Sequence, residues 1–435
     1  MPSLNVLYIH AHDAGRLVAP YGHKMPTPHL TRLASQGMLF RQAFCCGPTC
    51  SPSRAALLTG QSPHATGMLG LAHRGFSLDD YGRHLVNTLK PAGYTTLLSG
   101  VQHVVNWEDV DRIGYDEILT TNGHADQAAT AAETRIAAGM PEPFFLSVGC
   151  IEPHRPFPEP SLDEEAARFA RAPAPLPDTP DTRRDAAGFA MLVERYDAMV
   201  GRVLDALDDA GLAERTLVIC TTDHGPAFPG MKCTMSDWGL GVLLILLGPG
   251  IAAGTSTDAL VSHLDVFPTL CDWLDIAPPD WLEGRSLAPI LHGRADGVRD
   301  AIFGEVTYHA AYEPQRCVRT DRWKYIRRYG EKATPVLPNC DDGLSKTVFL
   351  DAGWAKRKLP REALYDLLFD PAESHNLIDD PALADTAAAL GQRLDRWMAD
   401  THDPLLTGPV VPAPSGVQIN DPDGLSPKET PRVIP

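Results

Sequence analysis

Residues 5–13, with the sequence NVLYIHAHD, form a short apolar run that ends in polar side chains. A run of this length is typical of a buried strand, and its polar end marks where the strand stops. Similar apolar runs recur at Thr96–Ser99, Phe144–Val148, Leu217–Cys220 and Leu243–Leu247. We therefore expect a series of buried strands distributed over the first 250 residues.

Helical patterns lie between these runs. Residues 27–37 and residues 189–211 both place apolar side chains at helical spacing and both end at a glycine. Strands that alternate with helices predict an α/β fold, in which a large, mixed, mostly parallel sheet is sandwiched by helices. In such folds, binding sites form at the carboxyl ends of the strands.

The pattern changes near residue 300. Residues 322–330 and 362–377 resemble strands joined by turns, and a helical pattern follows around 382–399. From Asp403 onward the chain is rich in proline, which favours an extended run over the surface.

The 435 residues are enough for one large domain with an appendage or for two domains. We expect a catalytic domain over residues 1–300. A smaller C-terminal α+β subdomain with an antiparallel sheet is expected over residues 301–435.

The net charge limits the kinds of partner that we expect, and the cysteine content argues against disulfide bonds. A net charge of −17 argues against nucleic acid. It permits a small anionic substrate, because salt screens charge over roughly 8 Å and a local cationic pocket then dominates. Nine cysteines form no disulfide framework in a chain of this length, so most are expected to be buried apolar residues.

No apolar run is long enough to span a bilayer, and the longest lies near Val242–Leu247. The chain opens with MPSLNVLYIH, which lacks the basic region and long apolar segment of a secretory signal. We therefore expect a cytoplasmic location and no membrane partner.

The stretch Cys45–Gly60, CCGPTCSPSRAALLTG, combines three cysteines with a helical pattern. Pro52 suits the first turn of a helix and Gly60 suits its end. Cys50 then lies at the helix N-terminus, where backbone N–H groups favour a thiolate or a bound anion. Arg54 follows on the same face and is able to reach back toward Cys50. From spacing alone, a capped surface helix with an incidental cysteine remains open.

The segment from Cys50 through Gly60 resembles the signature of the formylglycine-dependent sulfatases, which belong to the alkaline phosphatase-like superfamily. Residues 5–13, 221–225, 262–276 and 364–377 resemble further segments of that family, so the likeness covers most of the chain. The resemblance implies that a maturation enzyme oxidises the motif cysteine to formylglycine. The hydrated aldehyde then attacks sulfur and later expels sulfate, which divides hydrolysis into two easier steps.

The resemblance also implies one divalent metal ion. Its expected ligands are His12, Asp13, Asp223 and His224, together with the residue formed from Cys50. Calcium is the family's usual ion, and the family usually has aspartate where this chain has His12. Hard oxygen ligands suit Ca²⁺, whereas imidazole nitrogen suits Mn²⁺ or Zn²⁺. Either the nitrogen-rich site takes a transition metal, or His12 is no ligand and calcium binds through fewer oxygens.

Further family positions assign catalytic roles. Arg54 is expected to stabilise developing negative charge, and Lys232 to contact the sulfate and the departing oxygen. His154 matches a histidine near the sulfate and suits protonation of the leaving group. His103 is retained from the family's Gly-Lys-x-His pattern, but Val101 occupies the lysine position.

The N-sulfoglucosamine sulfohydrolase branch of the family shares further segments with this chain. These are residues 64–71 (HATGMLGL), 152–157 (EPHRPF), 223–232 (DHGPAFPGMK), 305–307 (EVT), Arg316 and 401–404 (THDP). From this branch we expect Glu305, His309 and Arg316 to line the substrate pocket.

The resulting hypothesis is a sulfatase that hydrolyses a sulfate ester or sulfamate, with a sugar as one candidate carrier. A phosphonate monoester hydrolase or phosphodiesterase on the same scaffold is the alternative. A glycan-binding pseudoenzyme is a third reading, because a lysine and a metal-loop aspartate of the family are replaced. The resemblance further implies a maturation enzyme as partner and, weakly, a homo-oligomer.

Overall fold

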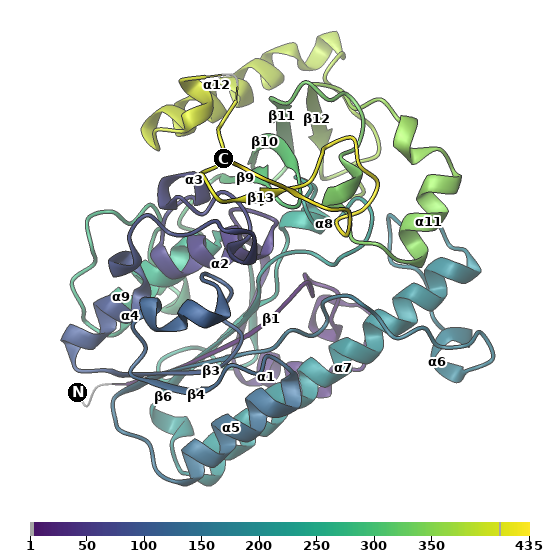
Figure 1. Ribbon diagram of the computed structural model, residues 1–435. Helices are drawn as coiled ribbons and strands as arrows, with labels where there is room; N and C mark the ends of the chain where they lie inside the picture. The colour runs from purple at the N-terminus through teal and green to yellow at the C-terminus, as the bar shows by residue number, and fades with distance from the viewer. Residues whose placement is uncertain (1–3, 409) are drawn as a thin grey trace.

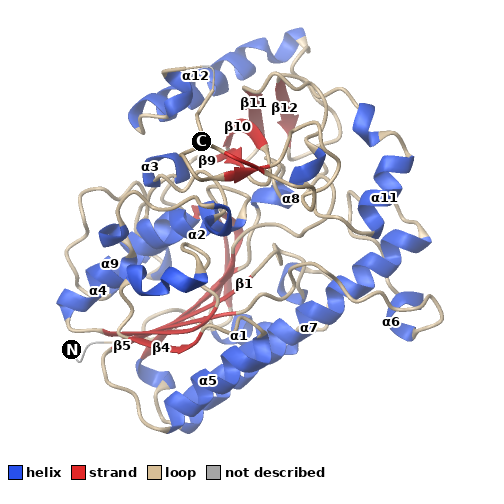
Figure 2. Ribbon diagram, viewed as in Figure 1, coloured by secondary structure: helices blue, strands red, loops and turns tan. Residues whose placement is uncertain are grey.

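The computed structural model describes residues 4–408 and 410–435 of the chain (Figure 1). An eight-stranded sheet with helices on both faces forms its larger part, and a four-stranded sheet packs beside one end (Figure 2). The expected α/β fold, with a second antiparallel sheet from the C-terminal part, is confirmed.

The large sheet contains strands from the first 262 residues. Its order is β4 (Glu117–Thr120), β3 (Thr95–Gly100), β5 (Phe144–Gly149), β1 (Asn5–Ala11), β6 (Thr216–Thr222), β7 (Leu244–Leu247), β2 (Met38–Phe44) and β8 (Thr255–Ser262). β1 pairs in parallel with β5 and β6 at the centre. β7 runs antiparallel to both β6 and β2, which makes the sheet mixed.

Both faces of the sheet are buried, which explains why the strands are apolar without alternation. Val6 and Tyr8 of β1 pack in the core on one face, and Leu7 and Ile9 pack in the core on the other. The first face is covered by α2 (Cys50–Thr59), α4 (Leu85–Leu89) and α9 (Val266–Trp273). The second is covered by α1 (Pro28–Gln36), α5 (Ala125–Ala137) and α7 (Pro180–Asp209).

Two edge strands escape sequence prediction. β4 is only half-buried, and β8 opens with polar, partly exposed residues, so neither forms an apolar run. The helix expected at 189–211 begins earlier, at Pro180. Thr179 caps it by accepting a hydrogen bond from the backbone N–H of Thr182, and this cap lies outside the apolar stripe.

The smaller sheet has the order β12 (Glu362–Asp366), β11 (Trp323–Arg328), β10 (Tyr312–Arg319) and β9 (Ile302–Tyr308). α12 (Ala384–Asp400) covers one face with Leu394 and Trp397. The other face joins the apolar core of the large sheet through Val306 and Cys317. Because the two sheets share this core, the division near residue 300 stays a prediction.

The remaining elements are short. They are α3 (Pro63–Thr66), α6 (Glu165–Arg168), α8 (Asp237–Leu240), α10 (Ala288–Leu291), α11 (Leu344–Asp351), β13 (Gln418–Ile419) and β14 (Arg432–Val433). The C-terminal tail is less exposed than expected, because Val417 and Ile419 are buried in the main core. Among the described residues, no helix has the length and apolar character needed to cross a membrane.

Candidate active site

The site lies at one edge of the large sheet, where β1 and β6 end and α2 begins. Asp13 follows β1, Asp223 follows β6, and Cys50 is the first residue of α2. Since β1 and β6 are adjacent and parallel, the turns after them meet. All three side chains are buried.

We call His12, Asp13, Cys50 and Asp223 the Cys50 cluster. One candidate ligand atom from each lies within 4.8 Å of those of the others. Nδ1 of His12 is 3.1 Å from Oδ2 of Asp223, yet this nitrogen makes no hydrogen bond. Four of the five residues named as ligands from the sequence are thus brought together.

His224 completes the arrangement. Its Nδ1 donates a hydrogen bond to the carbonyl oxygen of Gly225 at 2.9 Å, so Nε2 of the neutral ring carries the lone pair. Nε2 lies 3.3 Å from Oδ1 of Asp13 and 3.3 Å from Sγ of Cys50. A nitrogen lone pair that faces a carboxylate oxygen favours a cation between them.

The charges fit that role. Burial opposes ionisation of Asp13 and Asp223, but nearby positive groups keep the pKa of both below the usual range. Burial and the charge of Arg54 lower the pKa of His12 to about 4, which leaves its imidazole neutral. Two carboxylates and the neutral imidazole of His12 are therefore ready to act as ligands.

The spacing fits one small divalent ion. Ligand atoms bound to one ion at about 2.0–2.5 Å stand about 3–4 Å apart. The contacts among Asp13, Asp223, His12 and His224 range from 3.1 to 3.8 Å. The hydrogen bond from the His224 ring to a backbone carbonyl is the support that metal-binding histidines usually have.

Lys232 supplies a fixed cation beside the cluster. Its Nζ donates to Oδ2 of Asp13 and to Oδ2 of Asp341, both at 3.0 Å. Burial opposes its charge, but these two carboxylates raise the pKa of Lys232 well above the usual value. Val101, at the family's lysine position, is fully buried and adds no charge.

Asp341 was missed in the sequence. It comes from the loop before α11, far along the chain, and an acidic residue in a loop gives no local signal. Burial opposes its ionisation, but Lys232 holds the pKa of Asp341 well below its usual range. Only its contact with Lys232 identifies it as part of the site.

Arg54 takes a different position from the one expected. Its guanidinium donates to Nδ1 of His10, to the backbone oxygen of Ala11 and to Oδ2 of Asp223, rather than to Cys50. It therefore fixes the Asp223 carboxylate and the end of β1. His10 was also missed, because its only sequence signal is a polar residue inside an apolar run.

Two predicted histidines border the cluster. Nε2 of His154 is 3.9 Å from Oδ2 of Asp13, and its side chain is 29% exposed. The ring of His103 lies 5.3 Å from that of His12, centroid to centroid. Nε2 of His103 also pairs with Nδ1 of His73 at 3.1 Å, a partner that the sequence did not indicate.

Two of the expected pocket residues are elsewhere. Glu305 and Arg316 join His64 and Asp403 in a buried group that we call the Arg316 cluster. Arg316 donates from Nε to Asp403 at 2.5 Å, and its Nη2 lies 3.2 Å from Glu305. Nδ1 of His64 lies 2.9 Å from Glu305. Arg316 is fully buried and bound to these partners. The contact of Glu305 and Arg316 with substrate stays a prediction, and this burial argues against it.

His309 stays beside the site. It is buried, and burial together with the charge of Lys232 lowers the pKa of His309 well below the usual value. Asp341 and His224 also act on it electrostatically, which places His309 on the Lys232 side of the cluster.

Comparison with known sequences identifies the class of protein. The pattern of the Sulfatase family matches residues 4–276, and that of "N-sulphoglucosamine sulphohydrolase, C-terminal" matches residues 232–338. The chain belongs to the sulfatase family, and it is an enzyme of the sulfuric ester hydrolase class.

One relative is similar over nearly its full length. N-sulphoglucosamine sulphohydrolase of Homo sapiens is 30% identical, over 93% of this chain and 92% of that protein. The expected resemblance to this branch is confirmed.

Solved structures share the fold. A 2-O GAG sulfatase has a TM-score of 0.71 at 23% identity, over 95% of both chains. The phosphonate monoester hydrolase of Agrobacterium radiobacter has a TM-score of 0.69 at 22% identity, over 93% of this chain and 97% of that one.

Proposed function

We propose that this sulfatase hydrolyses a sulfate ester or sulfamate carried by a sugar, using formylglycine formed from Cys50 and one divalent cation. The observation that carries the proposal is the convergence on Cys50. The carboxylates of Asp13 and Asp223 and the imidazoles of His12 and His224 surround the first residue of α2.

Formylglycine would supply the attacking hydroxyl, and a cation held by Asp13, Asp223, His12 and His224 would lower the pKa of that hydroxyl. The N-terminus of α2 presents backbone N–H groups to the same point and favours a tetrahedral anion there. Arg54 keeps Asp223 in position through its hydrogen bond at 3.0 Å.

Lys232 and His154 act on the substrate side. The Lys232 ammonium is held at the site by Asp13 and Asp341, so its charge meets the sulfate oxygens without rearrangement. The Nδ1–H of His154 donates to a backbone carbonyl at 2.6 Å. Its Nε2 lies 3.9 Å from Oδ2 of Asp13, and in the doubly protonated ring this nitrogen would carry the proton that passes to the departing oxygen or nitrogen.

The sugar assignment is supported by the relative named above and by the match of residues 232–338 to the C-terminal pattern of that branch. His309 is the remaining candidate for contact with the group that carries the sulfate, because it is close enough to Lys232 to feel its charge.

A side-by-side assay tests the function. Protein produced with a formylglycine-generating enzyme is given N-sulfoglucosamine, an aryl sulfate and an aryl phosphate diester. We expect the highest kcat/KM for a sulfated substrate. A higher kcat/KM for the phosphate diester would favour the phosphonate monoester hydrolase alternative, which the shared fold supports. Turnover of none of them by fully converted protein would favour a pseudoenzyme.

Metal analysis tests the identity of the ion. Because His12 and His224 supply nitrogen, we propose Mn²⁺ or Zn²⁺ in preference to Ca²⁺. Protein purified without chelator is expected to hold about one equivalent of a transition metal. A full complement of calcium with no transition metal would contradict this preference while leaving the sulfatase assignment intact.

A further inference from the structure

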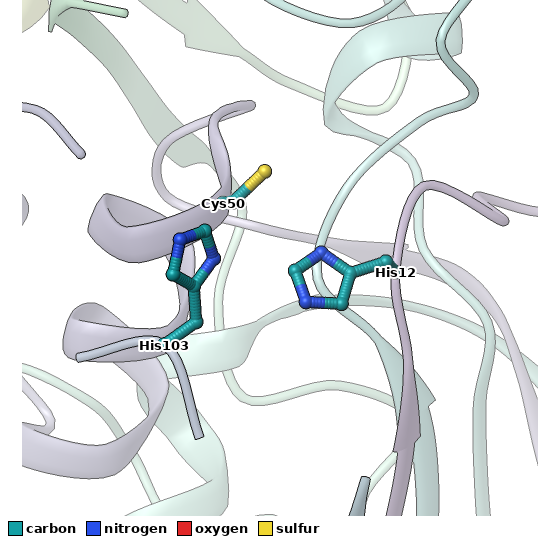
Figure 3. Close-up of side chains that lie close together, drawn as sticks. All are labelled: His12, Cys50 and His103. Atoms are coloured by element: carbon teal, nitrogen blue, oxygen red, sulfur yellow. The ribbon is translucent and has the colours of Figure 1, made fainter. Parts of the chain in front are cut away.

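Cys50 has two kinds of neighbour. The carboxylates of Asp13 and Asp223 are one kind, and the imidazoles of His12 and His103, which lie beside Cys50 in Figure 3, are the other. His12 follows β1, and His103 follows β3. Candidate ligand atoms of His12, Cys50 and His103 all lie within 4.8 Å of one another.

The two imidazoles have free nitrogens at the site. Throughout the described part of the chain, Nδ1 of His12 and Nδ1 of His103 are among the buried side-chain atoms that find no hydrogen-bond partner. Nε2 of His103 is engaged with His73, so Nδ1 is its remaining nitrogen. Each ring therefore has one buried nitrogen that is available to an ion.

The backbone holds His103 in place. Its φ of 57° is in the left-handed region, which residues other than glycine rarely adopt. The stacked ring of His73, with centroids 5.4 Å away, further fixes its imidazole. The ring is thus fixed by His73 while its Nδ1 stays buried without a partner.

We propose that the chain is a specific zinc-binding protein as long as Cys50 carries its thiol, with Cys50 Sγ, His12 and His103 as ligands. One thiolate and two neutral imidazoles are a preferred ligand set for Zn²⁺, and the carboxylate of Asp223 is close enough to be the fourth ligand. Binding breaks the S–H bond, forms a zinc–sulfur bond and releases one proton to solvent.

This site is distinct in chemistry from that of the mature enzyme. Burial raises the pKa of the Cys50 thiol well above its usual value, so the free thiol is neutral and inert. A coordinated zinc ion overcomes this, because a coordinating thiol is deprotonated outright. The aldehyde form has no sulfur, so it lacks this ligand, while the carboxylates of Asp13 and Asp223 remain. The inference concerns the unconverted chain and stands apart from the choice of substrate.

Cobalt titration tests the proposal. Protein from a host without the maturation enzyme is confirmed by mass spectrometry to carry the Cys50 thiol, stripped of metal and titrated anaerobically with Co²⁺. We expect about one equivalent to bind with a thiolate-to-cobalt charge-transfer band, and Zn²⁺ to displace it. The same titration of converted protein is expected to show no such band.

Two variants locate the ligands. Cys50→Ser should abolish the band, and His103→Gln should weaken Co²⁺ binding by at least about 10-fold. His124→Gln, which changes a side chain that is 65% exposed, is the matched control and should bind as the unsubstituted protein does.

Two results would overturn the proposal. One is bound Co²⁺ without a charge-transfer band in thiol-containing protein, which would assign the ion to the carboxylates alone. The other is unchanged affinity in His103→Gln. If that variant does not fold, X-ray absorption of the zinc-loaded parent decides, since sulfur and nitrogen neighbours are required and a shell of oxygen alone refutes the site.

Discussion

Two buried clusters in this protein have almost the same composition and opposite character. The Cys50 cluster and the Arg316 cluster each combine histidine with carboxylates, and each gathers its candidate ligand atoms within 4.8 Å. In the Arg316 cluster, a guanidinium lies between the acceptors, with Asp403 at 2.5 Å and Glu305 at 3.2 Å. In the Cys50 cluster, Nε2 of His224 and Oδ1 of Asp13 face each other at 3.3 Å.

The difference shows what separates a structural ion cluster from a functional one. Residue types and burial do not separate the two kinds of cluster, because both clusters contain histidine and carboxylates and both are buried. What differs is how the protein's own cations are placed. Arg316 bridges both carboxylates of its cluster. Arg54 and Lys232 each hold one carboxylate of the Cys50 cluster, and Nδ1 of His12 is left without a hydrogen-bond partner.

Replacing Cys50 tests this contrast with the largest expected effect. Cys50→Ala should lower kcat/KM by at least about 10³-fold, as loss of a catalytic nucleophile does, while the protein stays folded. Sulfate release is the measurement. Cys46→Ala, at a neighbouring buried cysteine, is the control and should retain activity. Comparable loss in both variants would mean that the effect is structural.

Breaking the Arg316 cluster should act on stability instead. Arg316→Met leaves Glu305 and Asp403 buried without their partner, which is expected to cost about 3–5 kcal/mol of unfolding free energy. Urea denaturation measures this. Arg322→Met, which breaks a half-exposed pair with Asp366, should cost about 0–1 kcal/mol. An Arg316→Met protein as stable as the parent but altered in substrate preference would restore the pocket role.

Asp223→Asn tests whether the Cys50 cluster binds a metal ion. Loss of this charge removes a metal ligand and the partner of Arg54, so we expect activity to fall at least about 100-fold, with weaker metal binding. Activity and metal content are measured together. Asp178→Asn, at an exposed carboxylate paired with Arg183, is the control. Unchanged metal content in Asp223→Asn would be inconsistent with its assignment as a ligand.

Asp341→Asn sharpens the assignment of Lys232. Without this carboxylate, Lys232 loses one of its two anchors, and kcat/KM should fall about 10-fold. Steady-state kinetics with a sulfated substrate provide the measurement. Asp342→Asn, which changes the next residue and its contact with Lys346, should have little effect. Equal loss in the two variants would assign the effect to the loop as a whole.

The smallest expected effect is on the pH dependence of stability, and it involves His64 of the Arg316 cluster. Burial alone would lower the pKa of His64, but the charge of Glu305 raises it above 6.5. A raised histidine pKa stabilises the fold fully below the unfolded-state pKa, and this stabilisation disappears as pH rises through the folded-state pKa. The stability difference between the parent protein and His64→Gln should therefore shrink as pH rises through the raised pKa of His64. A difference that grows with pH would contradict the charged state of His64.

Some residues of the site could be predicted from the sequence, and others could not. Asp13, Asp223 and Cys50 were found through the family resemblance, and the sequence pattern agrees because it places a strand end or a helix start at each. Asp341 comes from a loop and His73 from a single 3-10 turn, without such a pattern, so only the folded chain reveals them.

Glu305 and Arg316 were assigned to the pocket on family resemblance. The structure shows instead that the shared segments containing His64, Glu305, Arg316 and Asp403 meet in one buried ion cluster, a tertiary contact that no local pattern encodes.

The most direct measurement is the mass of the Cys50 peptide from protein made in a host with the maturation enzyme. We predict the aldehyde at position 50 and a sulfatase activity that rises in proportion to the converted fraction. Active protein in which Cys50 remains an unmodified thiol would contradict the proposal that the Cys50 cluster is a formylglycine-dependent centre.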